Sequence, residues 1–331
     1  GGVAAINPVP SVASITYSGG AGTSGDPYFI STIADVQILN FDRTRIGANT
    51  YYKLTGDINL GGATLTPIGT TSVTFQGNFD GQKHILSNFK EFGTYQVGLF
   101  GNVGVSAVIT NLILNDVTTS GGDNVGGLAG YSVGTISKVG IGGNSLIDGN
   151  NGGYDEVGGI VGALYKPGTI DQAYAGSSVT VRSAGGGSIG GIAGSAYGTA
   201  VTAGNSVTIS NSYSGAFIYG DIDRFGGIVG DSNYALIKNN YFTGIANDTN
   251  GNGYERGIVG TAWANMTLTD NYYDSTVCAS ASSYCSSTAL TGVTAYTTAQ
   301  MKDSANFPGG WDFTTIWLAP GAAYFKLRWE P

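Results

Sequence analysis

A short glycine-framed apolar motif recurs six times along this 331-residue chain. Its fullest form is VGGLAG at residues 125–130. The other copies are VGLFG at 97–101, VGGIVG at 157–162, IGGIAG at 189–194, FGGIVG at 225–230 and ERGIVG at 255–260. The closing glycines of successive copies are 29, 32, 32, 36 and 30 residues apart. Self-similarity at such a period is typical of solenoids, propellers and other repeat arrays.

A second motif follows each closing glycine in nearly constant phase. In its clearest copies an isoleucine, an asparagine and a tyrosine alternate with other residues. The copies start at Ile109, Ile136, Ile170, Ile209, Ile237 and Leu268. They begin 6 to 8 residues after the closing glycine, except in the fourth repeat, where an insertion lengthens the interval to 15. Two motifs in phase indicate one repeated structural unit.

The content of each repeat predicts its architecture. Nothing between the motifs reads as a convincing helix, which excludes helical solenoids. A propeller blade needs about 40–45 residues and four strands, whereas each repeat here has room for three short strands. We therefore predict an all-β chain that folds as a parallel β-helix, with about 30 residues per coil and coils stacked about 4.8 Å apart. The bias of parallel crossovers predicts a right-handed solenoid.

Stacked coils should align equivalent residues in ladders along the axis. The predicted aliphatic ladder contains Leu99, Leu128, Ile160, Ile192, Ile228 and Ile258. The predicted asparagine ladder contains Asn111, Asn211 and Asn239, with Gln172 and Asp270 as variants, and the predicted tyrosine ladder contains Tyr174, Tyr213, Tyr241 and Tyr272. Alternate strand residues share a face, so Ile209, Asn211 and Tyr213 should point together. The asparagines could bond between coils, and the tyrosines could form a core or turn ladder or a sugar-stacking surface.

One detail of the first motif has two explanations. The residue after each ladder aliphatic is also apolar, although it should face the other way; these residues are Phe100, Ala129, Val161, Ala193, Val229 and Val259. Either the strand bends there or its outer face is covered.

The ends of the repeat array should be capped, because stacked coils expose an apolar end. We expect residues 1–96 to hold an N-terminal cap and the first coils, with a short helix near 32–45 whose N-cap is Thr32. Residues 97–285 hold the repeats. Residues 286–331 lose the repeat and are interpreted as a second cap or a linker, within one continuous solenoid domain.

Charge is sparse and acidic. Charged residues make up 11% of the chain, against about 25% in an average globular protein. The formal net charge is −8, and no cluster of Lys or Arg offsets it, which argues against a nucleic-acid partner. No run approaches the ~18 apolar residues of a membrane-spanning helix, so direct membrane insertion is not expected. The terminal sequences are interpreted as those of a mature form or of a piece of a larger parent chain.

The two cysteines, Cys278 and Cys285, lie close together in CASASSYC. A metal site would need more ligands, and the chain has one histidine, His84. A local disulfide is favoured over two free thiols, and it would indicate an oxidising compartment: the periplasm, the cell surface or the medium.

The repeated G-[IL]-x-G core followed by I-x-N-x-Y resembles the GLUG repeat of large bacterial surface and secreted proteins. These include immunoglobulin A protease-type and filamentous-haemagglutinin-like adhesins. The flanks GTSGDPYFISTIADVQILN and MKDSANFPGGWDFTTIW resemble the segments that precede and close such blocks. The resemblance covers roughly residues 22–330 and implies a β-helical scaffold on the bacterial cell surface. It implies no particular activity, because proteins of different function carry GLUG blocks.

Catalytic chemistry finds little support in the sequence. His84 is the only candidate for a Ser/His/Asp triad, and no G-x-S-x-G motif exists. The variable loops before the glycine motif hold several carboxylates, but no pair stands out as a glycosidase pair. We therefore predict no enzyme and no cofactor. Calcium is the exception, because Asp248, Asn250 and Asn252 fit the first half of a calcium loop that lacks its twelfth-position Glu.

These observations predict a non-catalytic β-helical segment of a bacterial cell-surface adhesin. Its partner would be a cell-surface glycan or a protein receptor, contacted by the loops at 149–157, 183–189 and 218–225, which differ most between repeats. The alternatives are a polysaccharide-degrading β-helix and a stalk without a ligand.

Overall fold

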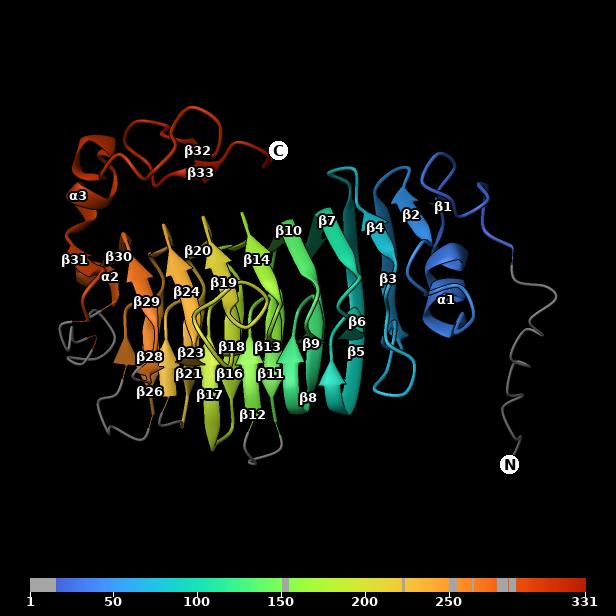
Figure 1. The fold of residues 1–331 in the computed structure, drawn as a ribbon, viewed down its shortest axis with the longest axis horizontal. Coiled ribbons are helices and arrows are strands. Elements are labelled where there is room, and N and C mark those ends of the chain that lie inside the picture. The colour runs from blue at the N-terminus through green and yellow to red at the C-terminus, as the bar shows by residue number, and fades with distance from the viewer. Residues whose placement is uncertain are drawn as a thin grey trace.

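The computed structural model describes residues 16–150, 155–221, 224–249, 255–263, 265–278, 285 and 290–331. In this part of the chain, strands of successive coils pair in parallel and build a solenoid whose coils stack along one axis (Figure 1). The paired strands form a 25-stranded sheet and a six-stranded sheet. The predicted parallel β-helix is confirmed.

Five ladders of strands run along the axis, and a coil passes through them in turn. The first contains β1 (Tyr28–Ile30), β2 (Tyr51–Leu54), β4 (Asn78–Asp80), β7 (Val108–Asn115), β10 (Thr135–Gly142), β14 (Thr169–Asp171), β19 (Val207–Ser210), β24 (Ala235–Lys238) and β29 (Thr267–Thr269). The second ladder begins with the later halves of β7 and β10. It continues with β15 (Tyr174–Ala175), β20 (Tyr213–Ser214), β25 (Tyr241–Phe242), β30 (Asn271–Asp274) and β31 (Val293–Tyr296). The third contains β3 (Ile58–Leu65), β5 (Ile85–Val97), β8 (Thr118–Gly126), β11 (Leu146–Gly149), β16 (Thr180–Ser183), β21 (Phe217–Gly220) and β26 (Ile245–Asp248).

The last two ladders flank the glycine motif. The fourth contains the ends of β5 and β8, then β12 (Asp155–Gly158), β17 (Gly187–Gly190), β22 (Arg224–Gly226) and β27 (Glu255–Arg256). The fifth is the six-stranded sheet of β6 (Phe100–Val103), β9 (Ala129–Ser132), β13 (Val161–Tyr165), β18 (Ala193–Tyr197), β23 (Val229–Asn233) and β28 (Val259–Ala262). The later coils are thus divided into five short strands.

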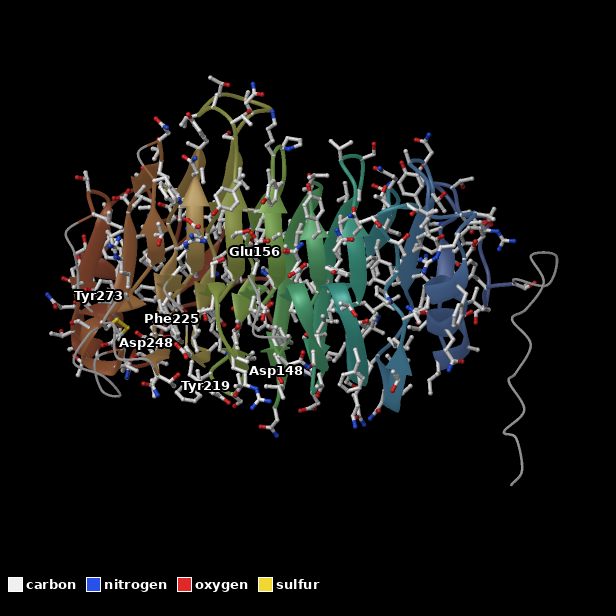
Figure 2. The ribbon with its side chains drawn as sticks, turned by 90° about the horizontal axis from the view of Figure 1, so that it is seen from below. Asp148, Glu156, Tyr219, Phe225, Asp248 and Tyr273 are labelled. Atoms are coloured by element: carbon white, nitrogen blue, oxygen red, sulfur yellow. A yellow bond between two sulfur atoms is a disulfide. The ribbon has the colours of Figure 1, made fainter. Side chains whose placement is uncertain are left out.

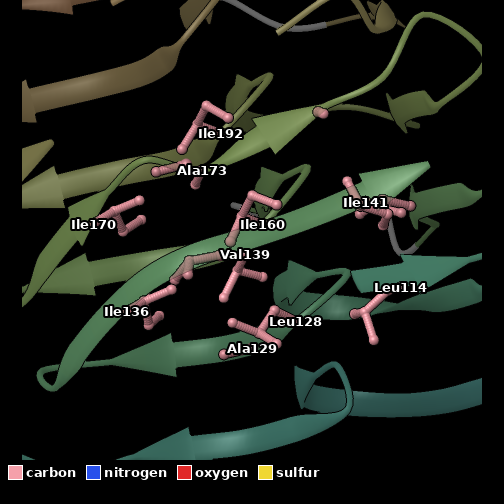
Figure 3. Close-up of a cluster of buried hydrophobic side chains, with 14 of the residues drawn as sticks. Leu114, Leu128, Ala129, Ile136, Val139, Ile141, Ile160, Ile170, Ala173 and Ile192 are labelled. Atoms are coloured by element: carbon pink, nitrogen blue, oxygen red, sulfur yellow. The ribbon is translucent and has the colours of Figure 1, made fainter. Parts of the chain in front are cut away.

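The interior of the solenoid is one continuous apolar cluster. All six residues of the predicted aliphatic ladder lie in it, each at most 1% exposed. Leu128, Ile160 and Ile192 follow one another from coil to coil in Figure 3. Ala129 and its equivalents are equally buried in the same cluster. The strand therefore bends at the motif, and both residues of the aliphatic pair face the core.

The bend depends on the glycines. A Cβ built on Gly162 would lie 2.5 Å from the backbone nitrogen of Val125, on the fourth ladder of the coil before. The same contact recurs along the axis: a Cβ on Gly194 would lie 2.4 Å from the nitrogen of Val157, and one on Gly230 2.5 Å from that of Ile189. Each closing glycine thus lets the fifth ladder pack directly on the fourth, backbone against backbone.

The predicted common face of Ile209, Asn211 and Tyr213 is wrong. Asn211 has a φ of 49°, a left-handed conformation that Asn adopts more easily than most residues. The chain turns there between β19 and β20, so Ile209 faces the apolar interior and Tyr213 packs outside it. The whole predicted asparagine ladder has positive φ, at 52° for Asn111 and 56° for Asn239. This column therefore marks a corner of the coil.

A buried amide ladder lies one residue after that corner. Asn240 and Asn271 are fully buried. The Asn271 amide donates to the carbonyl of Ile237 at 2.8 Å, and the Asn240 amide donates to the carboxamide oxygen of Asn271 at 3.0 Å. Asn240 in turn accepts a bond from the backbone N–H of Ser212 at 2.9 Å. These bonds join three coils inside the solenoid.

The N-terminal end is covered by a helix. The helix α1 (Ile33–Phe41) lies beside β1 and β3 (Figure 1). Thr32 is its N-cap, as predicted, and forms a capping box with Asp35. The helix ends four residues earlier than expected.

The C-terminal residues 297–331, here called the strap, turn back along the side of the later coils (Figure 1). The strap contains α3 (Thr298–Met301), a 3₁₀ helix η2 (Ser304–Asn306) and the antiparallel pair β32 (Trp317–Leu318) and β33 (Lys326–Leu327). Trp311 donates to the carbonyl of Asp270 at 3.1 Å, and Trp329 donates to that of Gln172 at 2.9 Å. Between these points the strap crosses the columns of four coils.

The glycine contacts generate a first prediction. Gly162→Ala should destabilise the fold by about 1–3 kcal/mol, because the added methyl overlaps backbone atoms that cannot rotate away. Gly56→Ala is the matched control, since nothing lies within 4 Å of a Cβ at that position. Chemical denaturation monitored by circular dichroism measures both variants, and equal stability would contradict the backbone contact.

A carboxyl group lies inside the core of the first coils. Glu91 aligns with Leu65 and Thr119 in the inward column of the third ladder and is 1% exposed. It accepts a hydrogen bond from the backbone N–H of Gly98 at 3.1 Å. Burial raises the pKa of Glu91 to about 8, so this side chain is protonated in the folded state at neutral pH.

A second prediction follows from Glu91. Between the unfolded pKa near 4.5 and the folded value near 8 the folded state holds a proton that the unfolded state has lost. The free energy of unfolding should therefore fall with rising pH across this window, on the order of 1 kcal/mol per pH unit from this group. Glu91→Gln should flatten that slope in urea titrations at pH 5, 6.5 and 8. An unchanged slope would mean that Glu91 is ionised in the folded state.

Candidate functional site

The fourth and fifth ladders meet along a polar line on the outside of the solenoid, here called the seam. Two columns of side chains face each other across it. The first column, on the fourth ladder, is Gln96, Asn124, Glu156, Ser188 and Arg224. The second column, on the fifth ladder, is Asn102, Tyr131, Ala163, Ser195, Asp231 and Thr261. The closing glycines bring the two columns together, because a glycine has no side chain to separate the fourth ladder from the fifth.

Polar contacts cross the seam at several heights. Near its N-terminal end the Asn102 amide donates to the Gln96 side-chain oxygen at 3.3 Å. Near the other end the Arg224 guanidinium pairs with Asp231 at 3.2 Å. Glu156 lies between these contacts. In Figure 2 it is well separated from Asp148 and Tyr219, which lie along one edge of the molecule.

Asp231 is the most heavily bonded carboxylate of the seam. It is 1% exposed. Besides Arg224, the indole N–H of Trp263 donates to it at 2.8 Å and the hydroxyl of Tyr197 donates to its other oxygen. These donors come from three consecutive coils. Asp231 is thus an anchor that ties the coils together, and its oxygens are occupied by protein donors.

Glu156 is in a different environment. It is half-buried, and burial raises the pKa of its carboxyl to about 7, with the charges of Asp231 and Asp123 adding to the rise. Arg224 acts in the opposite direction but pairs with Asp231. Glu156 is therefore close to half-ionised at neutral pH and responds to any charge placed beside it.

A row of tyrosines lies beside Glu156. The rings of Tyr131 and Tyr165 stack with centroids 5.4 Å apart, and those of Tyr165 and Tyr197 are 5.5 Å apart. Burial raises the pKa of Tyr165 to about 12, with the Glu156 charge contributing. The hydroxyls therefore stay neutral. The first pair of rings is stacked, with an interplanar angle of 29°, and the second is tilted by 51°.

Exposed aromatic rings stand at both ends of the seam. At the N-terminal end, Tyr95 is 69% exposed and lines a cavity of about 450 Å³ with Gln96, Asp123 and Asn124. At the other end, Trp263 is 50% exposed and is held by its bond to Asp231. Five coil steps separate them, a span of roughly 24 Å at the usual strand spacing. The arrangement can accommodate an extended polar molecule with flat apolar faces.

The predicted tyrosine ladder is not such a surface. Tyr174, Tyr241 and Tyr272 are at most 9% exposed, because the strap covers them. Tyr213 and Tyr241 stack with centroids 4.9 Å apart, and Trp317 packs against both. The structure places this ladder in a second apolar cluster outside the coil, so the sugar-stacking interpretation of these four residues is wrong.

The predicted asparagine ladder makes part of the bonds expected of it. The Asn239 amide donates to the Asn211 side-chain oxygen at 3.3 Å, but also to the carbonyl of Gly310 in the strap at 3.0 Å. Asn211 and Asn111 donate to Asp171 and Asp80 on neighbouring coils. These residues stabilise the corner and the strap and do not form a binding site.

The remaining predicted site residues lie near the C-terminal coils. A disulfide joins Cys278, at the end of α2 (Ser275–Cys278), to Cys285, with Cα atoms 5.6 Å apart. Asp248 ends β26 and is buried, whereas Asn250 and Asn252 lie outside the described residues. Among the residues that the structure describes, no group of three His, Cys, Asp or Glu side chains could hold a metal ion. Calcium binding stays a prediction.

The sequence analysis missed the seam. The seam residues lie next to the glycine motif, and the sequence indicated only a structural role for these positions. Signals were present: a tyrosine or an acidic residue stands directly after the closing glycine in two copies, at Tyr131 and Asp231, and Glu156 stands directly before another copy. The predicted contact loops at 149–157 and 218–225 lead into the seam strands, although residues 151–154 and 222–223 lie outside the described part.

No family model matches the chain, so the GLUG resemblance stays a prediction. The chain is similar to Halomucin of Haloquadratum walsbyi, with 36% identity over 155 residues, which are 44% of this chain and 2% of Halomucin. It is also similar to the "Putative Gly-rich membrane protein" of Evansella cellulosilytica, with 31% identity over 140 residues, 39% of this chain and 16% of that protein. The chain spans a small fraction of both relatives.

A solved structure shares the fold. The crystal structure of a putative immunoglobulin A1 protease from Bacteroides ovatus matches with a TM-score of 0.73 and 21% identity, over 95% of this chain and 96% of that one. At this identity the likeness shows the solenoid architecture alone. Among the described residues, no helix has the length and apolar character needed to cross a membrane.

The bonding of Asp231 generates a third prediction. Asp231→Asn should destabilise the protein by about 2–4 kcal/mol, because it leaves the Arg224 charge without its buried partner. Asp57→Asn is the matched control, since this carboxylate also has polar partners, His84 and the backbone N–H of Ile85, but its side chain is 65% exposed, where polar pairs contribute at most ~1 kcal/mol. Thermal unfolding compares the two, and similar losses would show that Asp231 is not an anchor.

Proposed function

We propose that this chain is a non-catalytic β-helical segment of a secreted or cell-surface adhesin, and that it binds an extended glycan along the seam. The observation that carries the proposal is the seam itself: exposed aromatic rings at both ends and a row of tyrosine hydroxyls and carboxylates between them, on a rigid frame. Sugar rings have apolar faces that pack on aromatic rings and hydroxyls that bond to carboxylates and phenols. Fixed side chains lose little entropy when a ligand binds.

Two further observations support a surface location. The disulfide between Cys278 and Cys285 fits an oxidising compartment. The similarity to Halomucin and to a glycine-rich membrane protein, each far longer than this chain, fits a repeated segment within a large surface protein.

A glycan array tests this proposal, followed by titration of the best ligand. Trp263→Ala and Tyr95→Ala should each weaken binding roughly tenfold, the usual effect of removing an aromatic anchor. Phe41→Ala is the control, because Phe41 is 52% exposed on α1, away from the seam. If no glycan binds, or if the seam variants bind like wild type, the seam is not the site.

A polysaccharide-degrading activity is the second candidate, because the raised pKa of Glu156 suits a general acid. Glycoside hydrolysis needs a second free carboxylate at a fixed separation; Asp231 is occupied by its donors, which leaves Asp123 for that role. Reducing-end assays on glycans bound in the array test this activity: turnover that disappears in Glu156→Gln would replace the adhesin proposal with an enzyme.

A further inference from the structure

The charges along the seam are unbalanced. Arg224 is paired with Asp231. The charge of Asp123 raises the pKa of Glu156, and in the described residues neither carboxylate forms an ion pair with a Lys or Arg of its own. The N-terminal half of the seam therefore offers two carboxylates without a dedicated cation.

A buried hydroxyl lies beside Glu156. Ser195 is fully buried and faces Glu156 across the seam, and its hydroxyl lowers the pKa of that carboxyl. Among the described residues it has no other hydrogen-bond partner. Ser195 and Glu156 therefore form one polar spot of the seam, with no cation from the described part of the chain paired to it.

The whole molecule favours a ligand of positive charge. A net charge of −8 repels polyanions such as uronic-acid or sulfated chains. The tyrosine hydroxyls beside Glu156 are neutral and offer acceptors to an ammonium group. The tyrosine centroids are 5.4 and 5.5 Å apart, close to the length of one sugar ring in an extended chain, so successive coils can meet successive sugars.

We propose that the seam selects linear glycans that carry protonated amines, that is, polymers of amino sugars, with Glu156 and Asp123 as the partners of the ammonium group. This inference rests on the proposed glycan-binding function and names its ligand class. An ammonium placed beside Glu156 favours the ionised carboxylate, so binding near neutral pH releases a proton from this group. Asp123, Asp231, Arg224 and the three tyrosines are the titratable or charged groups that face it.

Calorimetry with two matched probes tests the inference: a glucosamine hexamer and the fully acetylated N-acetylglucosamine hexamer, each at pH 5.5, where the amines and Glu156 both hold their protons before binding, in two buffers of different ionisation enthalpy. The glucosamine hexamer should bind at least ~5-fold more tightly, with net proton release. Glu156→Gln should remove both the preference and the proton release, and Asp123→Asn should reduce the preference. Asp116→Asn, an exposed position with a φ of 54° that Asn tolerates, is the control and should bind like wild type.

The outcomes separate the two proposals. Equal binding of both hexamers, or tighter binding of the acetylated one, overturns the charge selection but leaves glycan binding in place. Array binding confined to acidic glycans has the same consequence. If neither hexamer nor any glycan on the array binds, both proposals fall. A preference that survives in Glu156→Gln and Asp123→Asn overturns the assignment of these residues.

Discussion

The structure depends on one contact, the packing of the closing glycine of each motif against the backbone of the preceding coil. Elsewhere in the solenoid, side chains separate one strand ladder from the next. At the closing glycines no side chain lies between the fourth and fifth ladders, and their backbones are in direct contact. A Cβ at Gly162 or Gly194 would lie about as close to a backbone nitrogen as a covalently linked 1–3 neighbour does. From Gly130 to Gly260 the separation of the two ladders is thus fixed by backbone atoms that cannot change rotamer.

This corner explains how a repeating chain makes a site that does not repeat. The glycines and the aliphatic pair are constant, and they set where the neighbouring side chains lie. The residue after the closing glycine differs from coil to coil: Tyr131, Ala163, Ser195, Asp231 and Thr261. The seam therefore carries different chemistry at each height. The titratable carboxyl and the aromatic ends thus belong to single coils, whereas the buried anchor Asp231 joins three coils.

The sequence predicted the period, the solenoid and the aliphatic ladder, because these depend on spacing and on apolar character, which local patterns contain. The orientation of Asn211 was predicted wrongly. A continuous strand and two strands joined by a corner can have the same residue types at the same spacing. The left-handed φ of the corner residue cannot be recognised from the sequence alone. The sequence analysis also missed the seam. Glu156 and Asp231 are separated by more than two repeats, and their proximity follows from the register of coils that only the folded chain defines.

The strap was the least predictable element, because its tryptophans find their partners on coils far away in the sequence, as Trp329 does on Gln172. Its course has a mechanical consequence. A bare solenoid that is pulled at its end can lose its coils singly, since each is held by contacts to one neighbour. The strap crosses four coils in the reverse direction, so a load applied at the last coil also acts on the hydrogen bonds of Trp311 and Trp329 and on the bond that the Tyr213 hydroxyl donates to Glu330 of the strap. These coils consequently share the load and yield as a unit.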